Sequence, residues 1–271
     1  MKKRNYSLII GIICVSIIIA LFILSFIYLP YSVDQMDTKN RFASPSSSHI
    51  LGTDQFGRDI FSRILVSTRS ALLVSTSSVL MGALSGLILG ALAALSPHII
   101  ETILMRFIDA MMAFPGILSA MVLSAILGKG VMNASIAIAF FMVPVFARLS
   151  YSMILESKKR EYVKAAKSYG ASMPRLVVFH MLPEMVTRLI TQFSSSIGAA
   201  ILTESSLSFL GLGIQPPGAS LGLMLSEAKG YVLIEPYQAL WPGVVLSIAV
   251  LGFSLLGDGI NEYLNREVDY E

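Results

Sequence analysis

Charged residues are scarce in this sequence: only 14% of the 271 residues are Asp, Glu, Lys or Arg, while 55% are hydrophobic. Soluble domains carry nearer a quarter of charged residues. A chain this apolar could not keep its hydrophobic surface out of water as one soluble domain. The sequence therefore predicts an integral membrane protein.

Patterns that bind metals or nucleotides are also missing. The single cysteine, Cys14, can form no internal disulfide. The three histidines, His49, His98 and His180, stand far apart and lack the spacing of metal ligands. No Gly-x4-Gly-Lys-Ser/Thr phosphate loop occurs. We expect no metal site and no bound cofactor, so energy for any active transport must come from a partner or an ion gradient.

Six apolar segments approach the roughly 20 residues that a membrane-crossing helix needs. Because backbone polar groups must be paired in hydrocarbon, each should be helical. These segments are Leu8–Leu29, Ala71–Leu95, Phe107–Leu127, Val131–Tyr151, Leu189–Leu210 and Leu240–Gly257. The first is too long for a signal peptide and lacks an Ala-x-Ala cleavage site, so we expect it to remain as a helix. The fold class predicted is all-α, with six transmembrane helices.

Basic residues set the expected orientation. With the N-terminus inside, thirteen Lys and Arg fall on the cytoplasmic side and seven outside, so both termini are expected in the cytoplasm. The expected organisation has five parts: an N-terminal transmembrane helix (1–30), an extracellular segment with an interfacial helix around Arg63 and Arg69 (31–70), a five-helix core (71–260), a cytoplasmic loop within it (152–187) and a cytoplasmic tail (261–271).

Small and polar residues mark two helix faces. Gly82, Gly86 and Gly90 recur every four residues in the second segment and predict close helix packing. Polar residues in the fifth segment predict the wall of a translocation pathway, with polar packing between helices as the alternative. These pathway residues are Gln192, Ser195, Ser196, Thr203, Glu204 and Ser206.

Two acidic residues fall within or beside apolar segments. Asp109 follows Arg106 by about one turn, which predicts an ion pair between them. Glu204 is either near the outer membrane surface, paired or functional, because an unpaired charge within the bilayer is costly.

The cytoplasmic loop predicts a short docking helix. Tyr162, Ala165 and Ala166 give it a small apolar face, Gly170 a stop, and Pro174 the start of the next turn. Such a helix has little to pack on within this chain, so it is expected to dock into a cytoplasmic partner.

This loop resembles the coupling loop of ABC importer permeases, through Ala165-Ala166-x3-Gly170-x11-Leu182-Pro183, preceded by Glu161 and Tyr162. Four further blocks are similar to the second permease subunit of dipeptide, oligopeptide and nickel importers. They are Leu51-Gly-Thr-Asp-Gln-Phe-Gly-Arg-Asp59, Asp109 through Ala113-Phe-Pro-Gly116, Glu204 through Pro217, and Leu255-Leu-Gly-Asp-Gly259. The blocks follow the family order from Leu51 onward.

The resemblance implies the ABC importer type I permease fold in a bacterial cell membrane. It also implies a second homologous permease as heterodimer partner, two ATPase subunits that bind ATP and magnesium, and an extracellular substrate-binding protein facing Asp54–Asp59 and Gln215–Gly218. No nucleic-acid partner is expected. The cargo expected is a di- or oligopeptide, with nickel, cobalt or a metal–chelator complex as the alternative. An intramembrane enzyme and a membrane scaffold are remote alternatives.

Overall fold

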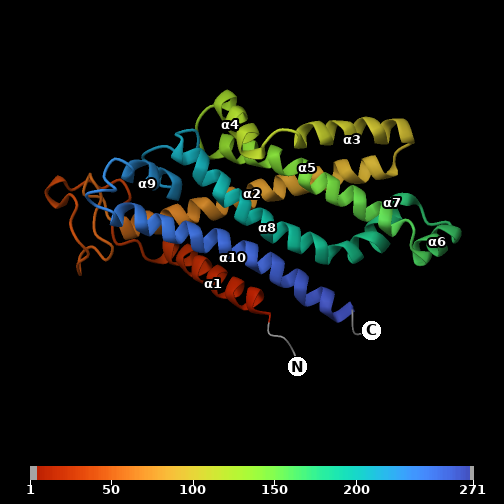
Figure 1. The fold of residues 1–271 in the computed structure, drawn as a ribbon, viewed down its shortest axis with the longest axis horizontal. Helices are drawn as coiled ribbons and strands as arrows, with labels where there is room; N and C mark the ends of the chain where they lie inside the picture. The colour runs from red at the N-terminus through yellow and green to blue at the C-terminus, as the bar shows by residue number, and fades with distance from the viewer. Residues whose placement is uncertain (1–4, 269–271) are drawn as a thin grey trace.

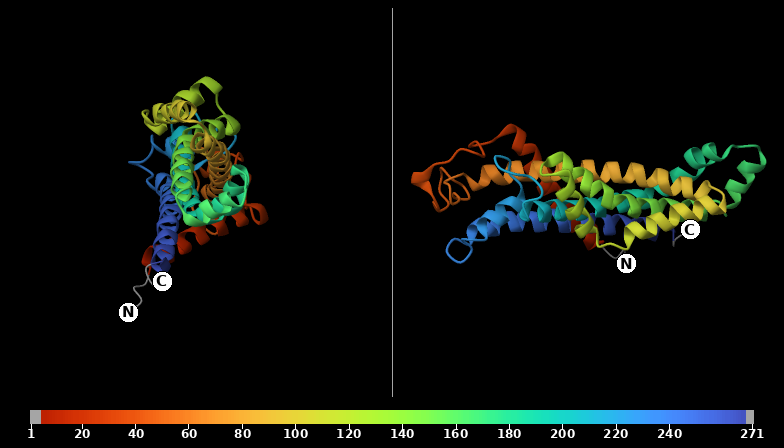
Figure 2. Two further views of the ribbon diagram at one scale, coloured as in Figure 1. Left: turned by 90° about the vertical axis from the view of Figure 1, so that its right-hand side faces the viewer. Right: turned by 90° about the horizontal axis from the view of Figure 1, so that it is seen from above.

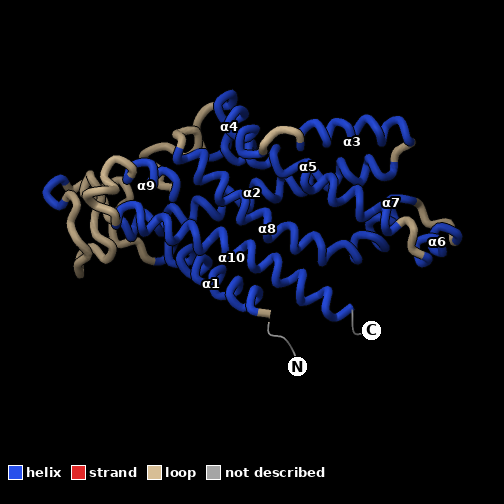
Figure 3. The backbone as a smooth tube through the Cα atoms, in the orientation of Figure 1, coloured by secondary structure: helices blue, strands red, loops and turns tan. Residues whose placement is uncertain are grey.

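The computed structural model describes residues 5–268, and these form an elongated bundle of helices joined by loops (Figure 1). No strand occurs in that part of the chain (Figure 3). The helices are α1 (Tyr6–Ile27), η1 (Thr38–Asn40), α2 (Ile60–Leu95), α3 (His98–Met112), α4 (Gly116–Leu127), α5 (Val131–Ser157), α6 (Glu161–Ser168), α7 (Met173–Leu176), the π-helical turn η2 (Val177–Met181), α8 (Leu182–Phe209), α9 (Leu221–Ala228) and α10 (Tyr237–Val268).

Among the described residues, four helices, α1, α2, α5 and α10, are long and apolar enough to cross a membrane. The third predicted span is broken into two helices, α3 and α4, which meet at 89°. Pro115 stands at this break as the N-cap of α4, where its missing N–H costs nothing. Counting the bent pair as one span raises the total to five.

The second predicted span is longer than the sequence suggested. Helix α2 runs without interruption from Ile60, where the Asp59 side chain accepts a hydrogen bond from the Ser62 backbone N–H at 2.8 Å, to Leu95. Such an N-cap satisfies a donor that the helix itself cannot pair. Arg63 and Arg69 therefore belong to the first turns of α2, and the expectation of a separate interfacial helix is wrong.

The core lies where α2 packs along α5 and where α8 packs along α10 and α2. Its largest fully buried side chains include Ile138, Met142 and Phe146 of α5 and Ile201 and Leu207 of α8. Helix α1 packs mainly on α10 and lies on the side of the bundle away from α3 (Figure 2).

The two ends of the bundle differ. Helices α6 and α7 form one end, while α9 and the loop between α1 and α2 form the other (Figure 1). The start of α1 and the end of α10 both point toward the α6 end. The basic residues Lys2, Lys3 and Arg4, which weighed in the predicted orientation, lie outside the described residues. The predicted tail at 261–271 begins inside α10, which is helical to Val268.

Candidate functional site

The candidate coupling surface is the α6 end of the bundle, where Val163 anchors α6. Val163 is buried, and it packs with Leu176, Met181 and Met153 in a small apolar cluster. Ala166 lies partly buried against the same cluster, while Ala165 is exposed. Helix α6 ends at Ser168, and two residues later Gly170 has a φ of +88°, the left-handed conformation that favours glycine. The helix stop predicted there is confirmed.

A polar network joins this short helix to the ends of α5 and α8. Glu156 of α5 accepts from Arg188 of α8 at 2.7 Å and from Arg160 at 3.2 Å. Arg160 lies 3.4 Å from Glu184 of α8. The Tyr162 hydroxyl donates to the same Glu184 carboxylate. Charged contacts as well as apolar ones therefore join α6 and its N-cap residue Arg160 to α5 and α8.

The Tyr162 hydroxyl is the donor in its contact with Glu184. Desolvation and the hydrogen bond to Glu184 both raise the pKa of the Tyr162 hydroxyl above its ordinary value, so it remains a donor. Of the residues in this network, only Tyr162 was predicted from the sequence as part of the site. The signal for the others was the Glu-to-Arg spacing of four residues, present in Glu156/Arg160 and Glu184/Arg188.

The rest of the predicted loop is open to solvent. Gly170 has no atom within 4 Å of an added Cβ. Leu182 and Pro183 begin α8 and are both exposed, Leu182 at 37%. Tyr169, which was not singled out, is 92% exposed and is the most exposed aromatic side chain on this surface. An exposed rim of this kind around one buried anchor suits contact with another protein.

The predicted pathway face of α8 divides into an open and a buried part. Gln192, Ser195 and Ser206 are half-buried, on the side of the helix that also exposes Ala199. Ser196 and Thr203 are buried, and the Thr203 hydroxyl donates back to the Ala199 carbonyl at 2.8 Å. A path running beside α8 would therefore meet Gln192, Ser195 and Ser206.

Glu204 points the other way. It is fully buried and accepts hydrogen bonds from Ser208 at 2.7 Å and from Ser205 at 3.4 Å. The expectation that Glu204 lines the pathway is corrected, because the rest of this chain covers it. Two serine hydroxyls replace the water that this carboxyl group loses on burial.

The glycine stripe of α2 faces α5. A Cβ added to Gly82 would lie 2.5 Å from the Met142 Cβ. Added to Gly86, it would lie 2.5 Å from the Val143 carbonyl oxygen, and added to Gly90, 2.2 Å from that of Ala147. Without side chains at these positions, the two helix backbones approach closely.

Asp109 pairs with a different residue from the one expected. Its carboxylate accepts from Arg148 of α5 at 2.5 Å, and Arg106 makes no ion pair with it among the described residues. This corrects the predicted Arg106–Asp109 pair. The three-residue spacing between Arg106 and Asp109 suggested that pair. The Asp109 carboxylate instead pairs with an arginine of α5 that lies 39 residues away in the sequence.

The end of the bundle opposite α6 contains a buried charge cluster. Asp54 and Glu227 are bridged by Arg58 and Arg63, with four N–O distances between 2.6 and 2.8 Å. His49 lies 3.0 Å from Asp59 in the same segment. The charged side chains of Asp54–Asp59 are thus turned inward, although Phe56 is 43% exposed. Of the two loops expected to face a binding protein, Gln215–Gly218 presents the more open surface.

Two other features carry no chemistry. Gly218-Ala219-Ser220-Leu221-Gly222 has the spacing of a serine-nucleophile elbow. No strand precedes it, and Ser220 is fully buried as the N-cap of α9, accepting from the Leu223 N–H at 3.1 Å.

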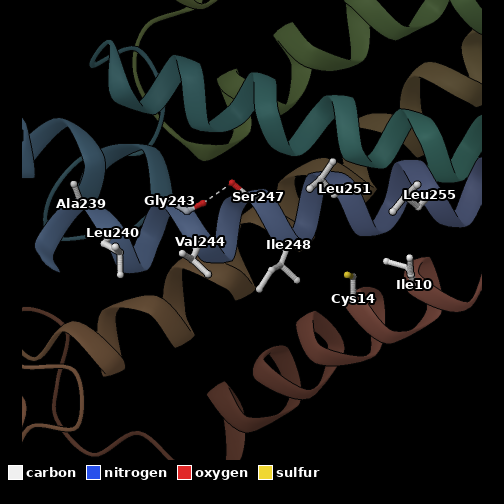
Figure 4. A pocket seen from close by; sticks show the side chains of 10 residues that line it. All are labelled: Ile10, Cys14, Ala239, Leu240, Gly243, Val244, Ser247, Ile248, Leu251 and Leu255. Carbon is white, nitrogen blue, oxygen red and sulfur yellow. Dashed lines mark hydrogen bonds between the residues drawn. The ribbon is translucent and has the colours of Figure 1, made fainter. Parts of the chain in front are cut away.

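A groove of about 410 Å³ between α1 and α10 (Figure 4) is lined by apolar side chains, and its one hydroxyl, from Ser247, donates to the Gly243 carbonyl. Apart from the weakly polar Cys14 thiol, the residues that line it offer no free polar side chain to a polar cargo.

Comparisons with known proteins agree over most of the chain. Residues 86–270 match the family described as "Binding-protein-dependent transport system inner membrane component". The chain is 40% identical over 241 residues to the glutathione transport system permease protein GsiD of Pectobacterium atrosepticum, covering 89% of this chain and 80% of that protein. It is 37% identical over 266 residues to the dipeptide transport system permease protein DppC of Alkalihalophilus pseudofirmus, covering 98% and 88%.

A solved structure shares the fold. A chain of the MetNI methionine ABC transporter, in an inward-facing conformation, superposes with a TM-score of 0.58 over 70% of this chain and 91% of its own. Sequence identity in that match is 19%, so the likeness extends to the fold alone.

Proposed function

Because the chain belongs to the family of binding-protein-dependent transport system inner membrane components, we propose that it forms half of the pathway by which small peptides enter a bacterial cell. The chain is a permease subunit of an ABC importer, it is not an enzyme, and it lies in the bacterial inner membrane with several spans. Its partners include an ATPase and a substrate-binding protein.

The relatives support peptide cargo. One is named for dipeptides and one for glutathione, which is itself a tripeptide. Both cargoes are small and carry free ammonium and carboxylate groups. Nickel, cobalt or a metal–chelator complex is the alternative cargo to be tested, and no residue of this chain separates the two by itself.

For the assembly, we propose a heterodimer with a second, homologous permease, served by two ATPase subunits that hold the ATP and magnesium. Six spans are proposed: α1, α2, the bent pair α3–α4, α5, α8 and α10. Helix α8 is the sixth, although its many polar residues keep it below the hydropathy of the others. Both termini would lie in the cytoplasm, because α1 begins and α10 ends toward α6.

Helix α6 supports the coupling role most directly. Val163 and Ala166 fasten it to the bundle while Ala165, Gly170 and Tyr169 remain free to contact another protein. When the ATPases close on ATP, the movement would pass from α6 to α5 and α8 through the Glu156, Arg160 and Glu184 contacts. Helices α5 and α8 would then expose the pathway first to one side of the membrane and then to the other.

The test of cargo is uptake of a labelled dipeptide by cells lacking the gene, compared with the same cells given the gene back. We expect uptake to fall on deletion and to return on complementation. If dipeptide uptake is unchanged while cellular nickel or cobalt falls, the cargo is a metal or a metal–chelator complex and the peptide proposal is wrong.

A further inference from the structure

A groove of about 630 Å³ lies at the α6 end of the bundle, on α7 and the π-helical turn η2. Its walls are formed by Pro174, Arg175, Val178, Phe179 and His180. Val178 and Phe179 are 52% and 70% exposed. The groove therefore offers an apolar surface that the described part of the chain leaves uncovered.

The backbone is irregular at this groove. The Leu182 N–H donates to the Val177 carbonyl five residues earlier, so this turn holds one residue more than an α-helical turn. Such π-helical turns are rare, and they recur at functional sites. The η2 turn also runs directly into α8, so the groove is joined to that helix without passing through α6.

Two polar groups of the groove have no partner among the described residues. Arg175 is exposed and makes no ion pair there, and the Nδ1 atom of His180 is buried without a hydrogen bond. Arginine pairs with carboxylates through the planar fork of its N–H donors. A carboxylate also accepts from a histidine ring that carries its proton on Nδ1. An acidic side chain therefore suits this groove.

The charge around the groove also favours an acidic partner. Residues 156–188 contain seven Lys and Arg but only three Glu, and all three glutamates are already paired with cations of this chain. Lys159, Lys167 and Arg175 are exposed and have no ion pair among the described residues. A complementary surface would carry Asp or Glu opposite them.

The groove stands beyond the lipid head groups, which are the other source of negative charge. The predicted fourth span ends at Tyr151, and α5 continues six residues to Ser157, or about 9 Å at 1.5 Å per residue. Helix α8 begins at Leu182, about 10 Å before the fifth span starts at Leu189. The head-group layer on each side is about 5–7 Å thick. Because the groove is built from residues before Leu182 at this end of the bundle (Figure 1), a soluble protein can reach it.

We propose that this groove is a second docking point for the ATPase subunit, which inserts an Asp or Glu side chain together with a neighbouring apolar one. The carboxylate pairs with Arg175, and the apolar side chain packs on Val178 and Phe179. This inference rests on the proposed permease function and specifies the chemistry of the partner's surface. With contacts at both α6 and η2, movement of the ATPase reaches α8 directly as well as through α6.

The experiment measures the affinity of purified ATPase subunits for the permease pair in phosphatidylcholine nanodiscs, over a range of salt concentrations. Arg175→Glu is compared with Lys159→Glu, which makes the same charge change at an exposed, unpaired residue outside the groove. Val178→Trp fills the groove, and Val232→Trp is its control, because Val232 is 43% exposed on the loop after α9. The charge variants are repeated in nanodiscs that also contain anionic phosphatidylglycerol.

We expect Arg175→Glu to weaken ATPase binding in phosphatidylcholine about tenfold or more and to reduce its dependence on salt. Lys159→Glu should have a much smaller effect. Val178→Trp should weaken binding as well, and Val232→Trp should leave it unchanged.

Unchanged affinity for Arg175→Glu, or equal losses for the two charge reversals, would overturn the inference, because the groove would then contribute nothing specific. An effect of Arg175→Glu seen only with phosphatidylglycerol would assign the groove to lipid and overturn it too. If the wild-type permease pair binds no ATPase at all, the proposed function fails instead.

Discussion

Gly90 lies where the backbones of α2 and α5 come closest. An added Cβ would lie 2.2 Å from the Ala147 carbonyl oxygen and 2.8 Å from the Ser150 Cβ. Real atoms cannot occupy these distances, and the obstacle is backbone, which moves only if the whole helix moves. The gain of about 1 kcal/mol in helix propensity from Gly to Ala is therefore outweighed.

We predict that Gly90→Ala lowers the stability of the purified subunit by about 1–3 kcal/mol, the usual cost of overpacking. The measurement is thermal unfolding in detergent. Gly230→Ala is the control, since nothing lies within 4 Å of its added Cβ, and it should leave the midpoint unchanged. An unchanged midpoint for Gly90→Ala would mean that the helices can separate without cost.

Arg63 illustrates a second residue-scale constraint. It is 2% exposed and its Nη1 atom contacts Asp54 at 2.6 Å and Glu227 at 2.8 Å. The two arginines and two acids of this cluster balance in charge. Removal of either arginine leaves an excess negative charge without solvent around it.

We predict that Arg63→Gln destabilises the protein by about 3–5 kcal/mol, as expected for breaking a buried pair by removing one partner. Lys164→Gln is the comparison. It removes an exposed ion pair to Glu161 at 2.8 Å, and such pairs contribute about 1 kcal/mol at most. If Arg63→Gln and Lys164→Gln lowered the free energy of unfolding by the same amount, burial of the charge cluster would not explain its contribution to stability.

Among the elements, α6 is held by few contacts and exposes most of its surface. Its eight residues are too few to be stable as an isolated helix. The Val163 anchor and the Glu184 contact of Tyr162 keep it in place. Function at this element therefore depends on side chains that face away from the bundle.

We predict that Tyr169→Ala weakens co-purification of the ATPase subunits at least tenfold while the subunit remains folded, since buried aromatic anchors dominate protein interfaces. The matched control is Tyr6→Ala, which removes an exposed tyrosine (66%) at the start of α1. Retention of the ATPases by Tyr169→Ala would place the contact elsewhere on the α6 end.

On the scale of the whole molecule, the two ends of the bundle should face opposite sides of the membrane. The only cysteine is Cys14, so a cysteine-free background needs one substitution. Lys167 on α6 and Ser47 in the loop between α1 and α2 are both exposed, and each provides a position for a single new cysteine.

We predict that, in a Cys14→Ala background, a membrane-impermeant maleimide labels Ser47→Cys in intact cells and Lys167→Cys only after the membrane is opened. Both variants should label fully in detergent, which controls for reactivity. Labelling of Lys167→Cys from outside would reverse the proposed orientation.

The sequence by itself determined what depends on neighbours along the chain. Apolar runs of about 20 residues located α1, α2, α5 and α10, because hydrocarbon requires each such run to satisfy its own backbone. Gly170 ended α6 for an equally local reason, its left-handed φ. The ordered motifs from Leu51 onward indicated the family for a similar reason, because each motif is a run of neighbouring residues in the sequence.

Only the tertiary structure decided which side chains meet. Asp109 takes Arg148 from α5 in preference to Arg106 nearby, and Glu204 turns into the subunit toward Ser208. Pro115 indicates a break in the third span, but the angle of 89° between α3 and α4 likewise depends on how the two helices pack. Ion pairs, burial and helix crossing angles depend on how residues that are dozens of positions apart in the sequence pack together. A periodic pattern on one helix does not show which other helix will pack against it.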